Sequence, residues 1–256
     1  MPELPEVEIT RRRLAPLLLG RRVVEVRTTR DGYFFLTPPR ELRRRLLGRR
    51  FETLERRGKY LVAGLNGGER LLLHLGMTGR LSSGGVPDAH THLRLRFEDA
   101  GPELLFRDVR KFGKVQVLAA GESSPRLARL GPDALAASPA QLHTAGRRRR
   151  APVKTLLLDQ SVLAGVGNIY ADEALFLAGL SPRRPACRLS RQDCVLLARA
   201  LKRVLRRAIS DGAGGRYRDE GRVYGRAGEP CRRCRTPIRR VVIGQRSSHY
   251  CPRCQR

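Results

Sequence analysis

Short segments of alternating hydrophobic and polar residues dominate the first part of the chain, and this pattern is typical of half-buried β-strands. The alternation is clearest where Leu93, Leu95 and Phe97 share one face and the intervening arginines share the other. Glycine, asparagine, aspartate and proline residues separate the predicted strands, which cover Arg22–Arg27, Lys59–Leu65, Arg70–Leu75, His92–Phe97 and Lys114–Leu118. A helix is expected from about Pro5 to Leu18. Many strands with a helix at one end predict a β-sandwich or a barrel.

The periodicity changes to that of helices after the last of these strands. Ser138 and Gln141, three residues apart around a proline, predict a helix that starts with a capping box. Ser190 and Asp193 predict a second, longer helix in the same way, and its apolar residues recur at helical spacing. The chain is therefore expected to be an α+β protein of two domains, with a boundary near residues 120–135.

Four of the six cysteines have metal-binding spacing. Cys231 and Cys234 form one pair and Cys251 and Cys254 the other, with sixteen residues between the pairs. This spacing is that of a four-thiolate tetrahedral zinc site. The alternative, two disulfides, suits a secreted chain, and the sequence starts with no secretory signal. The residues between the pairs predict a β-hairpin too small to fold without the metal, with Arg246 at its tip.

The charge of the chain points to a polyanionic partner. Lysine and arginine total 52 and aspartate and glutamate 24, which gives a formal net charge of +28. Such a surface attracts nucleic acid first and an anionic membrane second. No lipidation motif or basic amphipathic helix accompanies the charge, and the uncharged stretch 160–171 is too short to cross a bilayer. Nucleic acid is therefore expected, and no membrane.

The first eight residues contain three carboxylates, Glu3, Glu6 and Glu8, which is unusual in so basic a chain. Acidic residues favour the positive end of a helix dipole, and this accounts for the last two. Removal of Met1 would expose the secondary amine of Pro2. Because α-amines have pKa values of about 7.7–8, a useful fraction of that amine would be unprotonated and nucleophilic at neutral pH.

With these features together, the sequence resembles the bacterial formamidopyrimidine-DNA glycosylases, within the wider family that includes endonuclease VIII. The resemblance covers nearly the whole chain, and its motifs stand in family order. They are Pro2–Glu8, Arg57–Leu61, His74–Gly79, Asp108–Gly113, Leu158–Gln160, Gly165–Ala171 and the cysteine hairpin.

The resemblance implies a bifunctional DNA glycosylase and AP lyase of base excision repair. Such an enzyme removes formamidopyrimidines and 8-oxoguanine and then cleaves the strand by β,δ-elimination. Pro2 matches the family's nucleophile, which forms a Schiff base with the sugar. Glu3 matches the acid/base residue, and Lys59 matches the lysine that contacts the phosphate backbone beside the lesion. All three are expected to be catalytic.

The resemblance also implies a set of DNA contacts. Met77, Arg110 and Phe112 match the residues that fill the gap left by a flipped nucleotide and meet the opposite base. Asn168, at a glycine-rich helix start that suits a phosphate, and the hairpin arginine are expected to hold the damaged strand, and a lysine is expected near the flipped base. The full expected set is Met77, His92, Arg110, Phe112, Lys154, Asn168 and Arg246.

The family's architecture divides the chain into three parts. Residues 2–122 correspond to a catalytic β-sandwich domain with a flanking helix, 123–224 to a helical helix-two-turn-helix domain, and 225–256 to a four-cysteine zinc finger on a β-hairpin. The resemblance further implies one structural Zn²⁺ ion, damaged double-stranded DNA as the partner, a monomer, and a bacterial cytoplasmic location associated with the nucleoid.

One segment departs from the family pattern. The glycine- and charge-rich residues 210–224, expected to form an exposed loop, are fewer than in the family's loop over flipped 8-oxoguanine and lack its usual threonine pair. The preference for 8-oxoguanine is therefore open. Two alternatives remain, an endonuclease VIII-like glycosylase for oxidised pyrimidines and a non-catalytic zinc-containing nucleic-acid-binding protein. The Met77 set favours the purine enzymes, and a mere binder has no need of Pro2 and Glu3.

Overall fold

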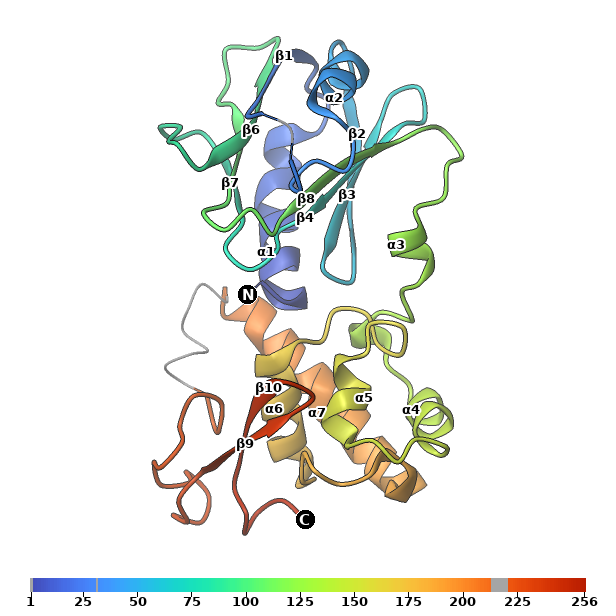
Figure 1. Cartoon of the computed structure of the whole chain (residues 1–256), viewed down its shortest axis with the longest axis vertical. Helices are drawn as coiled ribbons and strands as arrows, with labels where there is room; N and C mark the ends of the chain where they lie inside the picture. Colours follow the sequence, from blue (N-terminus) through green and yellow to red (C-terminus); the bar gives the residue numbers. More distant parts are fainter. Residues whose placement is uncertain (1, 31, 213–220) are drawn as a thin grey trace. The chain divides into compact units, whose positions relative to one another are not determined.

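The computed structural model describes residues 2–30, 32–212 and 221–256. The chain divides into two compact units, Met1–Ala128 and Arg129–Arg256. The first is built of strands around a helix, and the second is built of helices and one hairpin (Figure 1). The expected fold class, a β-sandwich followed by a helical part that ends in a hairpin with four cysteines, is confirmed.

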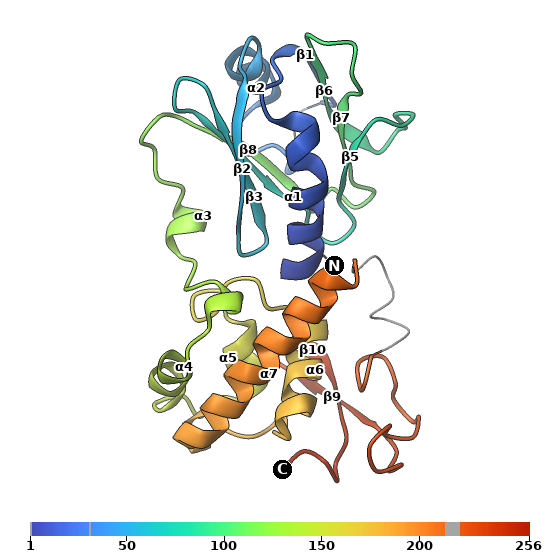
Figure 2. The same cartoon turned by 180° about the vertical axis from the view of Figure 1, so that it is seen from behind.

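Two four-stranded antiparallel sheets form the first unit, and helix α1 (Leu4–Leu18) lies between them (Figures 1 and 2). The strand orders are β1-β6-β7-β5 and β2-β3-β4-β8. The bounds are β1 (Val23–Thr28), β2 (Phe51–Arg57), β3 (Tyr60–Leu65), β4 (Arg70–His74), β5 (Arg80–Ser83), β6 (Thr91–Phe97), β7 (Leu104–Arg107) and β8 (Lys114–Leu118). Two short helices, α2 (Pro39–Leu46) and α3 (Pro125–Ala128), complete the unit.

The core of the first unit joins α1 to both sheets. Val7, Leu14 and Leu18 recur at helical spacing on α1, and all three are buried in one apolar cluster with strand residues such as Phe97 and Phe106. Burial of this face is what attaches the helix, since apolar area removed from water is the main favourable contribution to packing. The start of α1 is thereby fixed relative to the strands.

Each predicted strand is present within one residue of its expected bounds, and the burial pattern of β6 confirms the alternation. Strands β2, β5 and β7 were not predicted. In β2 the register shifts between Phe51 and Thr53, which breaks the alternation, and only Phe51 and Leu54 are buried. Strands β5 and β7 have four residues each, too few to show a period.

The second unit contains four α-helices of more than one turn, among its described residues, and two single 3₁₀ turns. The elements are η1 (Ala134–Ala136), α4 (Pro139–Gly146), α5 (Val153–Leu158), α6 (Asn168–Ala178), η2 (Ala186–Arg188) and α7 (Arg191–Ser210). Both predicted capping boxes are confirmed, with Ser138 accepting the Gln141 N–H at 3.1 Å and Ser190 accepting the Asp193 N–H at 3.0 Å. No helix among the described residues has the length and apolarity needed to span a membrane.

A two-stranded hairpin, β9 (Arg239–Ile243) and β10 (Arg246–Tyr250), follows the first cysteine pair. Gly244 and Gln245 form its two-residue turn, both with positive φ, of 54° and 61°, as a type I′ turn requires. Arg246 pairs with Ile243 and therefore begins β10. The prediction that Arg246 lies at the very tip is corrected by one position, because the tight turn needs only two residues.

Candidate functional site

The start of α1 is held by a capping box. Glu3 is the N-cap residue, its carboxylate accepts the N–H of Glu6, and its own N–H donates to Glu6 Oε2 at 2.8 Å. Glu3 is buried and Pro2, directly ahead of it, is half-buried. The two residues expected to act on the sugar are therefore neighbours at a rigid helix start. A Pro2 amine there would face the positive end of the helix dipole, which disfavours a protonated nitrogen.

Glu8, one turn further along α1, ties the helix to strand β2. Its carboxylate accepts hydrogen bonds from Arg11, Arg12 and Arg56, the last at 3.2 Å. Burial raises the pKa of Glu8, but the hydrogen bonds from Arg11 and Arg12 and the nearby positive charges outweigh burial and lower this pKa to about 2. Glu8 is therefore ionised in the folded protein at neutral pH, and α1 carries a charged anchor.

The hydrogen bonds around Glu8 and Arg56 extend to the hairpin that carries Lys59. Arg56 Nη1 donates to the carbonyl of Gly58 at 3.1 Å, and Gly58 and Lys59 form the two-residue turn between β2 and β3. Gly58 has a φ of +58°, which glycine adopts without strain at this position of a tight hairpin. One arginine thus connects α1, through Glu8, with the turn of Lys59.

His74 is a functional candidate that the sequence reasoning missed. It pairs with Tyr60 across β3 and β4, and the two rings lie 4.7 Å apart. Burial, with the positive charges of Lys59 and Lys114, lowers the pKa of His74 to about 4. Its Nδ1 accepts the Gly76 N–H at 3.1 Å, so in the neutral ring Nε2 carries the proton and is a donor. Its place in the His74–Gly79 motif was the available signal.

Two loops carry the expected gap-filling residues, and Asp108 fastens them together. Its carboxylate accepts the Thr78 hydroxyl at 2.5 Å and the N–H groups of Arg110 at 3.3 Å and Gly113 at 2.7 Å. The Arg110 N–H also lies 3.2 Å from Thr78 Oγ1. Asp108 is fully buried. The turn of Met77 and the loop of Arg110 are therefore a single assembly.

The side chains presented by these loops are accessible. Phe112 is 43% exposed and Arg110 is exposed, with its guanidinium 4.6 Å from the centre of the Phe112 ring. Met77 is half-buried. Gly76 permits the close approach of the loops, because a Cβ there would meet the backbone of Phe112 at 2.5 Å. An exposed aromatic ring and arginine on rigid loops can enter a base stack.

Two residues expected to contact DNA are buried. His92 is 1% exposed, its Nε2 lies 2.9 Å from the Asp108 carbonyl and its Nδ1 lies 3.2 Å from Thr29 Oγ1. Lys154 has 0% exposure and pairs with Asp172. Both side chains are buried within their own units, and their expected contact with DNA stays a prediction. Partners distant in sequence produce this burial, and single-sequence patterns do not reveal them.

The remaining expected strand contacts lie in the second unit. Gln160 accepts the Gly165 N–H at 2.9 Å and donates to the Val166 carbonyl at 2.9 Å, which shapes the turn ahead of α6. No side chain caps α6, whose first residue is Asn168. Asn168 donates to the Ser247 carbonyl at 2.9 Å, while Arg246 beside it is exposed. The structure thus brings Asn168 and the hairpin arginine together.

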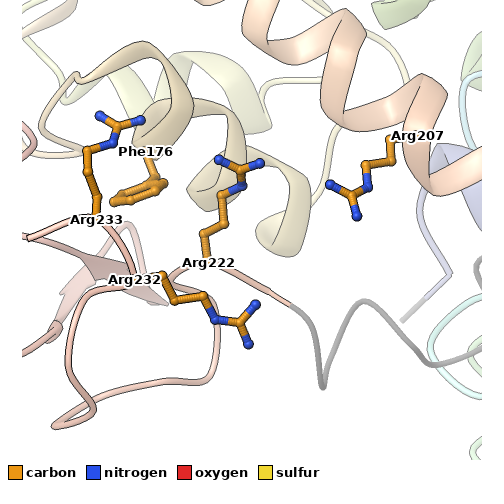
Figure 3. Close-up of a pocket in the computed structure, with 5 residues that line it drawn as sticks. All are labelled: Phe176, Arg207, Arg222, Arg232 and Arg233. Atoms are coloured by element: carbon orange, nitrogen blue, oxygen red, sulfur yellow. The ribbon is translucent and has the colours of Figure 1, made fainter. Parts of the chain in front are cut away.

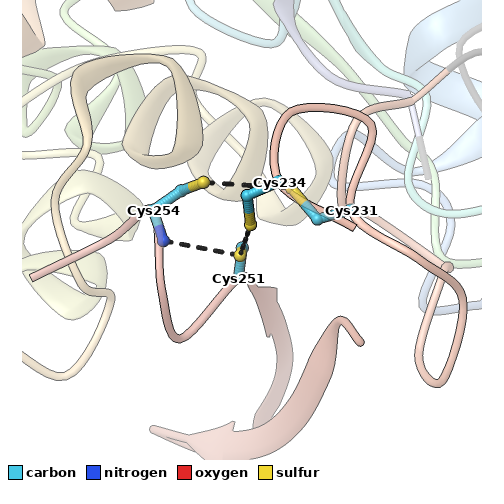
Figure 4. Close-up of side chains that lie close together, drawn as sticks. All are labelled: Cys231, Cys234, Cys251 and Cys254. Carbon is cyan, nitrogen blue, oxygen red and sulfur yellow. Dashed lines mark hydrogen bonds between the residues drawn. The ribbon is translucent and has the colours of Figure 1, made fainter. Parts of the chain in front are cut away.

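The four expected metal ligands form a compact cluster (Figure 4). The sulfur atoms of Cys231, Cys234, Cys251 and Cys254 all lie within 4.8 Å of one another, with separations of 3.4 Å for Cys234–Cys251 and 4.0 Å for Cys231–Cys254. A tetrahedral zinc ion with bonds of about 2.3 Å requires separations of roughly 3.8 Å. The thiols therefore fit zinc, and two of them pack in an apolar cluster with Phe176 of α6.

A pocket of about 440 Å³ in the second unit is lined by Phe176 and four arginines (Figure 3), namely Arg207, Arg222, Arg232 and Arg233. The Arg233 guanidinium lies 4.9 Å from the centre of the Phe176 ring. Buried Glu173 accepts the backbone N–H groups of Arg222, Val223 and Tyr224. This pocket favours anions, and it contains none of the expected site residues. Residues 213–220 of the expected short loop lie outside the described residues.

Three family models match successive parts of the chain. They are the formamidopyrimidine-DNA glycosylase N-terminal domain over residues 1–115, the formamidopyrimidine-DNA glycosylase H2TH domain over 130–219, and a zinc finger found in FPG and IleRS over 228–256.

Curated relatives and solved structures are similar over the full length. The formamidopyrimidine-DNA glycosylases of Thiobacillus denitrificans and Solibacter usitatus are 45% and 43% identical, each over 273 residues that cover 100% of both chains. The MutM (Fpg) protein of Thermus thermophilus has a TM-score of 0.89 and 41% identity, covering 99% of this chain and 98% of that chain. The Lactococcus lactis Fpg (MutM) in complex with FAPY-dG-containing DNA has a TM-score of 0.92 and 31% identity, covering 99% and 100%.

Proposed function

The chain belongs to the formamidopyrimidine-DNA glycosylase family, and we propose that it excises oxidised purines from double-stranded DNA and then cuts the strand. It is a DNA-formamidopyrimidine glycosylase with AP lyase activity, of base excision repair. One observation carries the mechanism: Pro2 directly precedes Glu3 at the capped start of α1. The four clustered cysteines hold one structural zinc ion.

Pro2 is the nucleophile in this proposal, after removal of Met1. Its nitrogen attacks C1′ of the damaged nucleotide, and the glycosidic bond breaks as the new bond forms, so that the base leaves with a proton. The proline nitrogen then loses its proton, the C1′–O4′ bond of the sugar ring breaks and O4′ takes up a proton, which leaves an iminium between the proline nitrogen and C1′. This iminium withdraws electrons. Loss of the C2′ proton expels the 3′ phosphate, and a second elimination expels the 5′ phosphate. Glu3, held by its capping box, moves protons between the sugar and the leaving group.

Two further groups of the first unit, Lys59 and His74, bind phosphate in this proposal. Lys59 supplies a compact positive charge on the β2–β3 turn, which Arg56 ties to α1. His74 supplies a neutral Nε2–H donor, because burial and the nearby lysines keep its pKa near 4. A donor that stays neutral contributes a hydrogen bond without a further positive charge. Together they hold the backbone beside the reacting sugar.

Base excision also requires that the nucleotide leave the duplex. Met77, Phe112 and Arg110 fill the vacated space and meet the opposite base, and the shared Asp108 makes them act as one wedge. Asn168 and Arg246 hold the damaged strand from the second unit without reading its sequence. His92 supports the wedge loop through the Asp108 carbonyl.

The 210–224 segment favours reduced discrimination between 8-oxoguanine and ring-opened purines. The alignments with the curated relatives are longer than this chain, so those relatives carry residues without a counterpart here. A smaller cover over the flipped base offers fewer contacts to the 8-oxo group. Excision rates on duplexes that carry 8-oxoguanine or a ring-opened purine measure this discrimination. The same measurement on an oxidised-pyrimidine duplex tests the endonuclease VIII-like alternative. A strong preference for 8-oxoguanine would contradict the proposal.

We further propose that the functional domains are residues 2–122, 123–224 and 225–256, and that the enzyme acts as a monomer on the bacterial chromosome in the cytoplasm. The curated relatives named above are bacterial proteins. The net charge of +28 supports association with the nucleoid.

The direct test blocks the nucleophile without touching the DNA-binding surface. One alanine is inserted between Met1 and Pro2, so that the proline nitrogen becomes part of a peptide bond and is no longer a free amine. The control variant carries the same additional alanine after Arg256. We expect the insertion to abolish nicking of an abasic-site duplex and to leave binding of that duplex unchanged. Full nicking by the inserted variant would refute Pro2 as nucleophile, and loss of nicking in every form would favour the non-catalytic alternative.

A further inference from the structure

The peptide that follows Arg246 receives two hydrogen bonds from other elements. The Lys154 ammonium of α5 lies 2.8 Å from the Ser247 carbonyl oxygen, and the Asn168 amide nitrogen of α6 lies 2.9 Å from the same oxygen. Two helices therefore converge on one carbonyl, directly beside the arginine that is proposed to hold the damaged strand.

Lys154 is itself held by a buried ion pair. Its ammonium lies 2.6 Å from Asp172 Oδ1, and both side chains have 0% exposure. Asp172 Oδ2 accepts the His249 N–H at 2.9 Å. Because alternate residues of a strand direct their backbone groups to the same side, Ser247 and His249 lie on one edge of β10. The pair thus binds the edge of the hairpin at two successive positions.

Zinc alone does not fix Arg246. Strand β10 ends beside the ligand Cys251, whereas Arg246 begins the strand at the opposite end, next to the turn. A two-stranded hairpin is marginally stable by itself. The contacts at Ser247 and His249 attach the zinc-distant half of β10 to α5 and α6.

We infer that the buried Lys154–Asp172 pair is a positioning device that aims Arg246 at the DNA backbone, and that Lys154 is a positioning residue that does not touch DNA. This inference rests on the proposed role of Arg246. A buried pair suits the task because separating its members would leave an uncompensated charge in the interior. An arginine held in place before DNA arrives loses less conformational freedom on binding, which strengthens binding.

A double-mutant cycle on the full-length, zinc-loaded protein tests the inference. The variant Lys154→Met/Asp172→Asn removes both charges, and the asparagine oxygen can still accept the His249 N–H. Lys202→Met, on α7, is the matched control. We expect the paired variant and Arg246→Ala each to raise Kd for an abasic-site duplex about tenfold, the range of one charge-assisted hydrogen bond. Lys202→Met should leave Kd unchanged.

The variant that combines Lys154→Met/Asp172→Asn with Arg246→Ala shows whether the buried pair acts through Arg246. If the pair acts through Arg246, adding it to Arg246→Ala produces no further rise in Kd. A further tenfold rise would show that Lys154 contacts DNA directly and would overturn the inference. An Arg246→Ala variant with unchanged Kd would instead refute the proposed strand contact, so the two failures are distinguishable.

Amide hydrogen exchange of the free protein provides a readout that does not depend on DNA. In the paired variant, exchange should accelerate at the Arg246–Ser248 amides and stay unchanged at the cysteine knuckles. Unchanged exchange at the hairpin would overturn the inference. Faster exchange throughout α6 and α7 would do so as well, because it would assign the pair to the stability of the whole unit.

Discussion

Single buried carboxylates hold the elements that carry the proposed reacting and wedge residues of the first unit. Asp108 connects the loops of Met77 and Arg110, and Glu8 connects α1 with Arg56. Both are acceptors that several donors share, so loss of either leaves donors unsatisfied in the interior, at a cost of about 1–3 kcal/mol for each buried group. Activity therefore depends on residues that touch no substrate.

Thr78→Val removes the hydroxyl that links the two wedge loops without changing the volume of the side chain. We expect about 1 kcal/mol of lost stability and a several-fold slower excision of 8-oxoguanine, because the wedge is less rigid. Nicking of an abasic-site duplex, in which no base must leave the stack, should be unchanged. Equal slowing on both duplexes would show that Thr78 serves the chemistry and not the wedge.

Glu8→Gln should destabilise the protein in a pH-dependent manner. The pKa of Glu8 is about 2 in the folded protein and ordinarily 4.5, so its stabilising contribution is full above pH 4.5 and disappears as pH falls towards 2. We expect the variant to be roughly 2 kcal/mol less stable at pH 7. Urea unfolding at pH 7, 5 and 3 measures the difference, and a difference that does not shrink with falling pH contradicts the account.

At the scale of elements, local signals were predictable and distant partnerships were not. Ser138 and Ser190 predict helix starts because all residues of a capping box lie within four positions of the chain. The cysteine spacing likewise predicts the metal site. The burial of Lys154 depends on Asp172 and Ser247, which are distant in sequence. The role of Asp108 likewise depends on Thr78 thirty residues earlier. Family motifs predicted the site residues, but only the structure revealed what holds them.

Zinc removal should release the hairpin while leaving the first unit intact. Cys254→Ser removes one ligand, and the finger packs its other cysteines with Phe176 and Ile238 in a small apolar cluster that we expect to loosen without metal. The variant should lose zinc and bind DNA at least tenfold more weakly, because Arg246 is no longer held. Cys187→Ser, at an exposed cysteine outside the cluster, is the control. Unchanged affinity in the zinc-free variant would contradict this role.

At the scale of the whole molecule, the attraction to DNA and the proposed excision reaction depend on different features of the protein. The net charge of +28 supplies attraction to any duplex, whereas excision in the proposed mechanism depends on one amine at the start of α1. Phosphate contacts carry no base information, so DNA affinity and lesion choice are set by different residues. The basic composition predicted nucleic acid as the first candidate partner, whereas the family resemblance implied damaged duplex DNA and the reaction.

Arg246→Ala should weaken binding uniformly across DNA sequences. Loss of one phosphate contact is expected to reduce the slope of log Kd against log salt by about 0.9. Titrations of two duplexes of unrelated sequence at several salt concentrations measure both effects. A loss of affinity confined to one sequence would indicate that Arg246 reads bases.

Borohydride trapping detects a Schiff base between Pro2 and the sugar of the damaged nucleotide. The enzyme is mixed with a duplex that carries 8-oxoguanine opposite cytosine, and in parallel with an oxidised-pyrimidine duplex, with Pro2→Gly as the control variant. We expect a covalent protein–DNA band on the purine duplex that Pro2→Gly diminishes, because reduction fixes the Schiff base on the proline nitrogen. Tight binding with no covalent band on either duplex would contradict this expectation.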